Sequence, residues 1–370
     1  MNEGKTADRL LDPINLYRCV AVLLVFSLHA CILNGKAFTC PDMLKESSLA
    51  FLFWTPAWGG VYFFWLLSGY LAGKGYVDGR YGTSLSETWR YYKKKLMNVY
   101  VPTMCFNVAV GVASFPDFFP QNWIALRQML TFTYNGAPGV NGIGATWFVF
   151  TLMWFYLFTP LFCRAAIKIG SKRKIGCLLF LMMMGEAVYR LYAGYHRLDW
   201  YTMVYTTPLA NIDMFFCGTC LAYLLKNGDF REAVTRFAQL MFVPCFFGYI
   251  VLACWMLAYN QHVGILQYVM PTGYLVLGLW FLAVFRTKMP LRRFGGGTIV
   301  LLIDWFSGIS FEFYLFHSLV LDRISHLIGG PTAVLQHFKL LFFTIVLTVF
   351  MSIGYHRIFG RKPYREKIAS

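Results

Sequence analysis

Long apolar stretches recur along this chain, and each is close to the length that crosses a lipid bilayer. A helix needs ~20 apolar residues to cross ~30 Å of hydrocarbon. Helices suit that region because they satisfy their backbone hydrogen bonds internally, where no water is present. The sequence therefore predicts an all-α membrane protein, a polytopic bundle of about ten transmembrane helices, at residues 14–34, 54–73, 97–115, 144–163, 174–193, 204–225, 238–258, 265–285, 307–327 and 338–357.

The composition agrees with a membrane protein. The 370 residues are 58% hydrophobic and 14% charged, whereas soluble domains are ~45–50% apolar and ~25% charged. Residues 1–12 are polar, and no small-residue cleavage site follows the first apolar stretch. We therefore expect that stretch to be a retained span rather than a cleavable signal.

Two segments depart from the simple pattern of crossings. Residues 297–327 are apolar over too great a length, and Gly308 interrupts them. We predict an interfacial piece at 298–306 and a span at 307–327. A second helix that does not cross is predicted at 121–133. The chain then divides into a cytoplasmic N-terminal segment, one transmembrane domain and a basic cytoplasmic tail, at residues 1–13, 14–358 and 359–370.

Basic residues alternate between the connections. If the N-terminus is inside, every internal segment is basic, as at Lys93–Lys95, whereas the external segments hold few basic residues, among them Arg190. Cytoplasmic loops carry an excess of Lys and Arg. The alternation predicts a multi-pass protein of the cell membrane with both termini in the cytoplasm.

The net charge of +16 has two explanations. One is this topology, together with attraction to anionic membrane lipids of the inner leaflet. The other is that part of the basic surface receives an anionic cosubstrate from the cytosol. The charge is scattered over short loops and forms no basic domain, which argues against a nucleic-acid partner.

The ten cysteines form no disulfide framework or metal motif. Cys217 and Cys220 have the spacing C-x-x-C, but they fall inside an apolar helix with no histidine nearby. We interpret them as small apolar packing residues rather than as redox or metal ligands, and we expect no metal site.

The first span carries two ionisable residues, Arg18 and His29. Eleven residues on a helix are three turns plus ~20°, so the two side chains share one face, roughly 16 Å apart along the axis. Ionisable groups inside a membrane are functional candidates because they are costly to bury. Arg18 could instead extend to the inner interface, and His29 could be a hydrogen-bonded packing residue.

A second histidine within a span is His317, predicted at a depth similar to that of His29. Two imidazoles at one depth suggest a polar pocket or a proton-transfer site, although a helix–helix hydrogen bond would also explain His317. Glu186 and Arg190 stand at i and i+4 and are expected to pair. Asp213 and Glu312 remain as acids without an assigned partner.

An ordered set of short motifs resembles the membrane-bound acyltransferase-3 family over about residues 14–364. The first span matches the family's Arg, ten residues, then His. The other matches, in order, are the aromatic run Val61–Tyr70 containing Leu67-Ser68-Gly69, the basic Lys93–Lys95 leading to Pro102, Trp147-Phe148 with Pro160-Leu161, Asp213-x-Phe215-x-x-Gly218, Gly308-Ile309-Ser310 with Tyr314-Leu315-Phe316-His317, and Lys362-Pro363-Tyr364.

The resemblance implies an enzyme that moves an acyl group from cytosolic acyl-CoA, in the first instance acetyl-CoA, to a hydroxyl of a carbohydrate or glycolipid. Acyl-CoA is then a cosubstrate rather than a bound cofactor. Arg18, Lys94 and Lys95 are expected to hold the CoA phosphates. His29 is the expected general base, and His317 would orient the acceptor or stabilise developing charge.

Four further positions follow from the same motifs as candidates for substrate binding, namely Ser68, Trp147, Asp213 and Tyr314. Two other functions stay open on the sequence. Polar groups within about ten spans also suit a transporter or flippase of a glycolipid or small polar solute. A non-catalytic membrane sensor could use the same scaffold.

Overall fold

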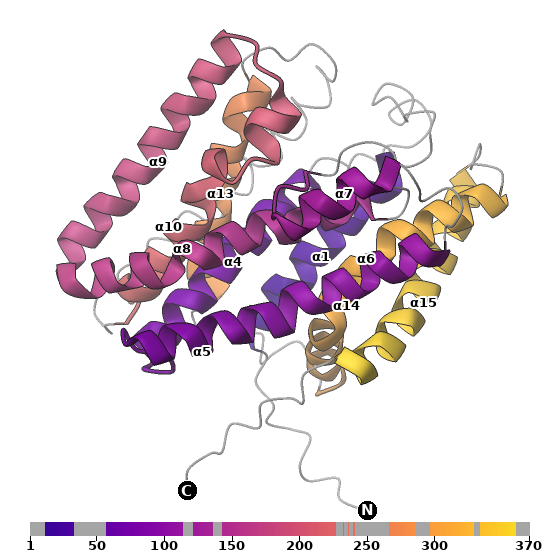
Figure 1. Ribbon diagram of the computed structural model, residues 1–370, viewed down its shortest axis with the longest axis horizontal. Coiled ribbons are helices and arrows are strands. Elements are labelled where there is room, and N and C mark those ends of the chain that lie inside the picture. Colours follow the sequence, from indigo (N-terminus) through magenta and orange to yellow (C-terminus); the bar gives the residue numbers. More distant parts are fainter. Residues whose placement is uncertain are drawn as a thin grey trace, which may run out of the picture.

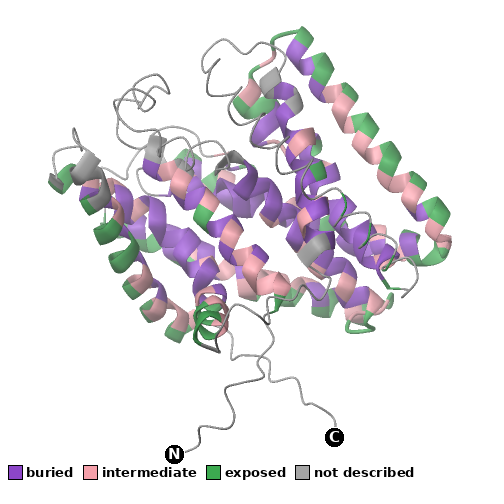
Figure 2. Ribbon diagram, turned by 180° about the vertical axis from the view of Figure 1, so that it is seen from behind, coloured by how far each residue is buried: buried purple, intermediate pink, exposed green. Residues whose placement is uncertain are grey.

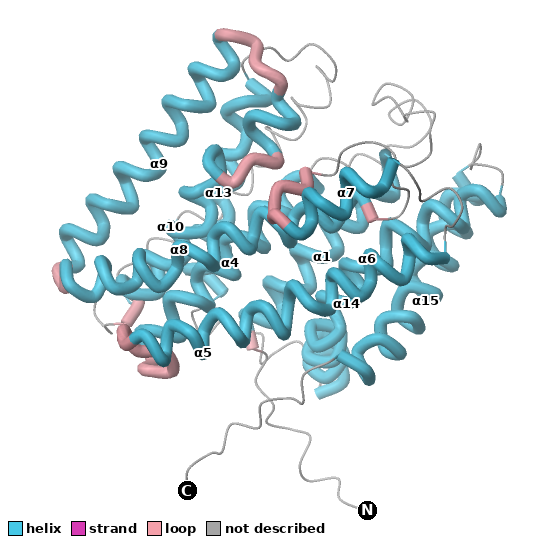
Figure 3. Tube along the Cα trace, in the orientation of Figure 1, coloured by secondary structure: helices cyan, strands magenta, loops and turns pink. Residues whose placement is uncertain are grey.

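The computed structural model describes residues 12–32, 57–113, 121–135, 143–226, 266–285, 297–328 and 334–359, with the single positions 232, 236 and 240. Within these residues every regular element is helical, as Figure 3 shows. Figure 1 shows how the helices are arranged. They are α1 (Pro13–Ile32), α4 (Ala57–Val77), α5 (Leu85–Lys95), α6 (Val101–Ala113), α7 (Gln121–Leu130), α8 (Trp147–Ile169), α9 (Lys172–Tyr195), α10 (Ile212–Leu224), α13 (Leu266–Phe285), α14 (Gly297–Ile328) and α15 (Val334–Phe359).

Five of the described helices are long and apolar enough to cross a membrane, at Leu85–Ala113, Gly144–Ile169, Lys172–Tyr195, Thr298–Leu327 and Lys339–Phe359. Each predicted apolar stretch except the seventh coincides with a helix. The seventh, at 238–258, lies outside the described residues apart from position 240. The expected helix that does not cross, at 121–133, corresponds to α7. The chain is an all-helical, multi-pass membrane protein.

Glycines let α4 and α10 pack at very short range. A Cβ atom added to Gly69 would lie 1.8 Å from the carbonyl oxygen of Phe215, and one added to Gly218 would lie 2.1 Å from that of Leu66. Small residues allow helix backbones to approach closely in membranes, where packing replaces the hydrophobic effect as the force between helices. The Thr219 hydroxyl also donates to the Gly69 carbonyl at 3.0 Å. These contacts fix α10 against α4 at the centre of the bundle.

Burial falls from the centre of the bundle to its edges, as Figure 2 shows. In the candidate span Gly144–Ile169, 72% of the 18-residue apolar stretch is buried in the protein. In Lys172–Tyr195 only 11% of the corresponding stretch is buried. An apolar helix with so little protein contact is one that faces lipid. Helix α9 therefore forms a lipid-facing edge, and it lies along one side of the molecule in Figure 1.

The predicted interruption of the ninth region at Gly308 is wrong, whereas its division into an interfacial piece at 298–306 and a span at 307–327 stays a prediction. Residues 297–328 form one continuous helix, α14, of 32 residues. Gly308 lies inside it, and a Cβ added there would meet nothing within 4 Å. A glycine costs ~1 kcal/mol relative to alanine in a helix, but in an apolar setting the backbone has no water to bond with and keeps its helical bonds. The helix is ~48 Å long, so it extends beyond the hydrocarbon instead of breaking within it.

The predicted sixth span, 204–225, begins too early. Its α-helical part, α10, starts only at Ile212 and has 13 residues. A π-helical turn at Tyr201–Tyr205 and a 3-10 turn at Leu209–Asn211 precede it. Pro208 stands between them and has no N–H to continue a helix. The sixth span is therefore an interrupted helix, a feature that the apolar pattern did not reveal.

Candidate functional site

Helices α1 and α14 meet along a seam that is polar at both ends. At the end nearer Pro13, Arg18 Nη1 donates to Ser307 Oγ at 3.0 Å, and Ser307 Oγ donates to Asn15 Oδ1 at 3.0 Å. Asn15 Nδ2 in turn donates to Asp304 Oδ1 at 2.9 Å. Arg18 is thus held in a chain of bonds that joins the two helices.

At the other end of the seam, the rings of His29 and His317 meet edge to face, with centroids 4.9 Å apart. His29 is half-buried, and His317 is 1% exposed. Since Arg18 and His29 both contact α14, the prediction that they share a face of the first helix is confirmed. The pairing of Arg18 with Ser307 and of His29 with His317 also shows that α1 and α14 run in the same direction.

The hydrogen bond of His317 defines its tautomer. Nδ1 lies 2.5 Å from the carbonyl oxygen of Tyr314. A carbonyl oxygen only accepts, so Nδ1 carries the hydrogen and donates, and in the neutral ring Nε2 keeps its lone pair. Nε2 is buried and has no hydrogen-bond partner among the residues that the structure describes. Buried polar atoms are nearly always paired in native structures, so this nitrogen is a ready acceptor for a hydroxyl that enters the seam.

Aromatic packing separates the two polar ends of the seam. Phe26 contacts both the Phe313 ring, at 5.7 Å, and the His317 ring, at 6.4 Å. The Tyr314 hydroxyl donates to the Ala145 carbonyl, in the 3-10 turn that leads into α8. Tyr314 and Trp147, both expected to bind substrate, are buried in this aromatic wall. The histidine pair therefore lies in a largely dry setting that the start of α8 closes on one side.

The two lysines expected beside Arg18 lie on α5, where Lys95 contacts α8 and α5 itself and Lys94 contacts the segment before α5. Lys95 Nζ stands 4.0 Å from the centre of the Tyr156 ring and 5.5 Å from that of Tyr91. Lys94 is exposed, 5.7 Å from the centre of the Tyr81 ring. These three contacts of the lysine ammonium groups with aromatic rings are cation–π contacts. Ser68 is half-buried on α4.

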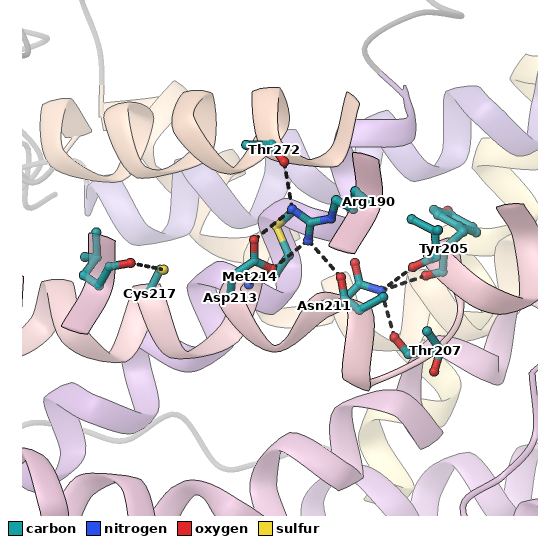
Figure 4. Close-up of polar contacts among 11 residues, drawn as sticks. Arg190, Tyr205, Thr207, Asn211, Asp213, Met214, Cys217 and Thr272 are labelled. Atoms are coloured by element: carbon teal, nitrogen blue, oxygen red, sulfur yellow. Dashed lines mark hydrogen bonds and ion pairs between the residues drawn. The ribbon is translucent and has the colours of Figure 1, made fainter. Parts of the chain in front are cut away.

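The expected pairing of Glu186 with Arg190 is wrong, and Arg190 is not a residue of an external loop. Its guanidinium reaches from α9 to α10, where Nη2 and Nη1 donate to the two carboxylate oxygens of Asp213 at 2.7 and 2.8 Å (Figure 4). Both side chains are fully buried. A buried carboxylate requires a partner more strongly than a half-buried one does, which explains why Arg190 bonds to Asp213 rather than to its neighbour on α9.

Two further contacts complete the setting of Arg190. Nη1 also donates to the Thr272 hydroxyl on α13 at 2.9 Å, and Nη2 donates to the Ala210 carbonyl at 2.9 Å (Figure 4). The bidentate fork thus joins α9, α10 and α13. Asp213, a predicted substrate-binding residue, has both carboxylate oxygens occupied by Arg190.

Asn211 holds the interruption before α10. Its side-chain amide nitrogen lies within hydrogen-bond distance of three carbonyl oxygens, those of Val204 at 2.7 Å, Thr207 at 2.9 Å and Tyr205 at 3.3 Å. Two of these carbonyls end the π-helical turn and the third follows it, so all three lie where the helix is interrupted. Irregular backbone at membrane depth must be satisfied in this way. The two turns before α10 therefore depend on one amide.

Sequence reasoning missed several of the residues that organise the site. Ser307 had no signal, because a serine in an apolar stretch is unremarkable until its partner on α1 is known. The role of Arg190 was hidden by the nearby Glu186. Glu312 proves to pair with His356 across α14 and α15, at 2.7 Å. The described residues contain no group of three His, Cys, Asp or Glu side chains that could hold a metal.

The comparisons with known proteins agree with the geometry. The acyltransferase-3 family model, described as an acyltransferase domain, matches residues 12–354. No curated protein and no solved structure matches the chain. The matched region runs from the start of α1 almost to the end of α15 and includes Arg18, His29 and His317. The chain therefore belongs to the acyltransferase-3 family, as a multi-pass membrane enzyme that transfers acyl groups other than aminoacyl groups.

Proposed function

We propose that this enzyme transfers an acyl group, in the first instance acetyl, from cytosolic acyl-CoA to a hydroxyl of a cell-surface or lipid-linked carbohydrate. The observation that carries the proposal is the placing of one cation and two imidazoles along a single seam. Arg18 lies at one end and the His29–His317 pair at the other, roughly 15 Å apart along the helices. That span suits an extended donor with an anionic end and a reactive thioester end.

The directions of the helices agree with a crossing pattern of about ten spans, and the basic connections favour both termini in the cytoplasm. Helices α1 and α14, the predicted first and ninth spans, run in the same direction, as their pairs of contacts require. Helices α4 and α10, the predicted second and sixth, also run in the same direction, since Gly69 meets Phe215 and Gly73 meets Thr219. Spans separated by an even number of crossings must be parallel.

In this orientation Arg18 lies at the cytoplasmic end of α1. We propose that Arg18, with Lys94 and Lys95, receives the phosphates of acyl-CoA through charge-assisted bonds. Arg18 is the one of the three whose hydrogen bonds also join α1 to α14. The lysines would act as point charges at the rim. The thioester then extends along the bundle toward the histidines.

For the acyl transfer itself, the tautomer of His317 supports a division of roles between the two rings. Nε2 of His317 accepts the proton of the acceptor hydroxyl as that oxygen attacks the thioester carbonyl. His29, half-buried beside it, positions the hydroxyl and stabilises the charge that develops on the carbonyl oxygen. The attack forms the ester and expels the CoA thiolate, which takes up a proton. This assignment moves the general base from His29, the expected residue, to His317.

Inverted membrane vesicles test the proposal. Acetyl-CoA labelled in its acetyl group is supplied outside such vesicles, where the cytoplasmic face is exposed, and the glycans are then extracted. Label in ester linkage to glycan supports the proposed reaction. Movement of an unacylated glycan across the membrane without label would favour a flippase and contradict it. Vesicles with the Arg18→Gln variant should show a raised KM for acetyl-CoA.

A further inference from the structure

A cavity of about 480 Å³ lies against α8, and neither His29 nor His317 is among its lining residues. Its walls come from α8, from the start of α10, from the interrupted segment before α10 and from the loop that follows α7. Pockets of 300–1,000 Å³ with aromatic walls and a few polar groups are the usual binding sites for small molecules. The proposed reaction assigns no role to this cavity.

The cavity becomes less polar along its length. Thr151 on α8 donates to the Thr206 carbonyl at 3.0 Å, so α8 and the interrupted segment meet at this level. One and two turns further along α8 stand Phe155 and Phe158, and Phe216 stands at the matching level of α10. Both walls thus change from hydroxyl groups to aromatic rings in the same direction. Among the described residues, no charged side chain lines the cavity.

The interrupted helix is the second observation that points to a ligand. Helix α10 alone is ~20 Å long, too short for ~30 Å of hydrocarbon, and Thr206–Leu209 continue the wall as irregular backbone. Non-helical backbone at membrane depth occurs where it is buried in protein or lines a cavity. Interrupted transmembrane helices commonly form binding sites. Here the interruption supplies the polar end of the cavity.

The end of α7 forms the facing wall. Phe132, which lines the cavity, has φ of 58° because it is the left-handed residue of a Schellman motif that ends α7. Its N–H donates to the Met129 carbonyl at 3.2 Å, and the next N–H along the chain donates to the Gln128 carbonyl at 2.8 Å. The Phe132 carbonyl accepts a hydrogen bond from Trp154 Nε1 at 2.9 Å, and its ring packs on Tyr100 with centroids 5.1 Å apart. These contacts fix Phe132 in the wall of the cavity.

We propose that this cavity binds a glycolipid, with an uncharged, hydroxyl-bearing headgroup at the threonine end and a hydrocarbon chain along the aromatic end. The lining matches both halves of such a molecule and, in the described part of the chain, offers no cation for a phosphate. The aromatic end reaches the lipid-facing surface, because Phe158 is 47% exposed. A chain can therefore enter from the bilayer.

The two sites are connected at their polar ends. Thr151 lies about one turn along α8 from Trp147, and the turn before Trp147 bears the Ala145 carbonyl that Tyr314 bonds. Tyr314 contacts the His317 ring at 5.5 Å. The start of α8 and Tyr314 thus lie between the threonine end of the cavity and His317. If the proposed function holds, the cavity is the binding site of the lipid-linked acceptor.

Photo-crosslinking in lipid nanodiscs tests this site. The probe is a glucosyl diacylglycerol with a diazirine in one acyl chain, in phosphatidylcholine nanodiscs without an acyl donor. We expect crosslinks on peptides that contain Phe158 and Phe216. Thr207→Trp and Thr133→Trp, which block the threonine end from two walls, should each lower crosslinking roughly tenfold. Leu161→Trp, on α8 but outside the lining and 67% exposed, should leave it unchanged.

A diazirine phosphatidylcholine of the same chain length is the lipid control. Equal labelling of the cavity by both probes, or full labelling in folded Thr207→Trp or Thr133→Trp, would overturn the proposal by indicating ordinary boundary lipid. The His29→Ala variant separates this proposal from the proposed function, because crosslinking requires no acyl transfer. The variant should be labelled normally although it does not acylate. If the wild-type protein is labelled at the cavity but never acylates a glycan, the cavity proposal stands and the proposed reaction is contradicted.

Discussion

Arg190 and Asp213 form a bidentate ion pair, at 2.7 and 2.8 Å, with both side chains fully buried. Breaking such a pair leaves one charge buried and uncompensated, at a cost of ~3–5 kcal/mol. We expect Asp213→Asn to lower the midpoint of thermal unfolding in detergent strongly, measured as the fraction that remains monodisperse after heating.

Glu186→Gln is the matched control for the ion pair, because Glu186 lies one turn from Arg190 on α9 and is only half-buried. Its unfolding midpoint should change far less. Equal losses in the two variants would show that the Arg190–Asp213 contact is not what joins α9 to α10.

The close approach of α4 and α10 predicts opposite results for two glycines. Gly69→Ala forces a Cβ to 1.8 Å from a backbone oxygen of α10, so the helices must separate and the protein should lose stability and abundance. Gly185→Ala on α9 meets nothing within 4 Å and should be neutral or stabilise by ~0.5–1 kcal/mol, as a glycine-to-alanine change in a helix does. Matched membrane abundance of the two variants would contradict the packing.

The interrupted sixth span predicts that an isosteric change at Asn211 is not tolerated. Asn211→Asp keeps the shape but removes the amide donor and places a carboxylate against three carbonyls. Each buried group left unsatisfied costs ~1–3 kcal/mol. The variant should unfold at a clearly lower temperature than Thr151→Val, which removes a single bond to this segment. The reverse order would show that the amide does not hold the turns.

Apolar length and motif spacing predicted the helical class of the protein, the positions of most helices, the shared face of Arg18 and His29, and the family. They could not predict the interruption at residues 201–211, because hydropathy is blind to whether an apolar segment is helical throughout. They also misjudged Gly308, because the cost of a glycine depends on whether water competes for the backbone. The spacing of four residues suggested Glu186 as the ion-pair partner of Arg190. The partner in the structure is Asp213, because the fold buries that carboxylate more deeply.

Outside the predicted spans, Asp199 provides a pH-dependent contact. Its carboxylate accepts from the Thr202 hydroxyl at 2.5 Å and from the Thr202 N–H at 2.9 Å, and these bonds hold its pKa below the ordinary value of 3.8. A carboxylate with a lowered pKa stabilises the fold above its unfolded pKa, and this stability is lost as the pH falls through the folded pKa. The effect is small because Asp199 is exposed.

The unfolding midpoint of the wild type should therefore fall slightly more between pH 6 and pH 3 than that of Asp199→Asn, which cannot titrate at this position. Thermal unfolding of both proteins at the two pH values checks this prediction. A larger fall in the variant would reverse the sign and contradict the hydrogen-bonded arrangement.

The central claim is that the His29–His317 pair carries the acyl transfer, and single-turnover transfer of labelled acetyl from acetyl-CoA to a glycolipid in nanodiscs tests it most directly. We predict that His317→Ala and His29→Ala, folded and at wild-type abundance, lose at least the ~10²-fold that a general base contributes, whereas His326→Ala, on the same helix as His317 but 74% exposed at the side chain, retains wild-type rates. Wild-type transfer by His317→Ala and His29→Ala would contradict the account.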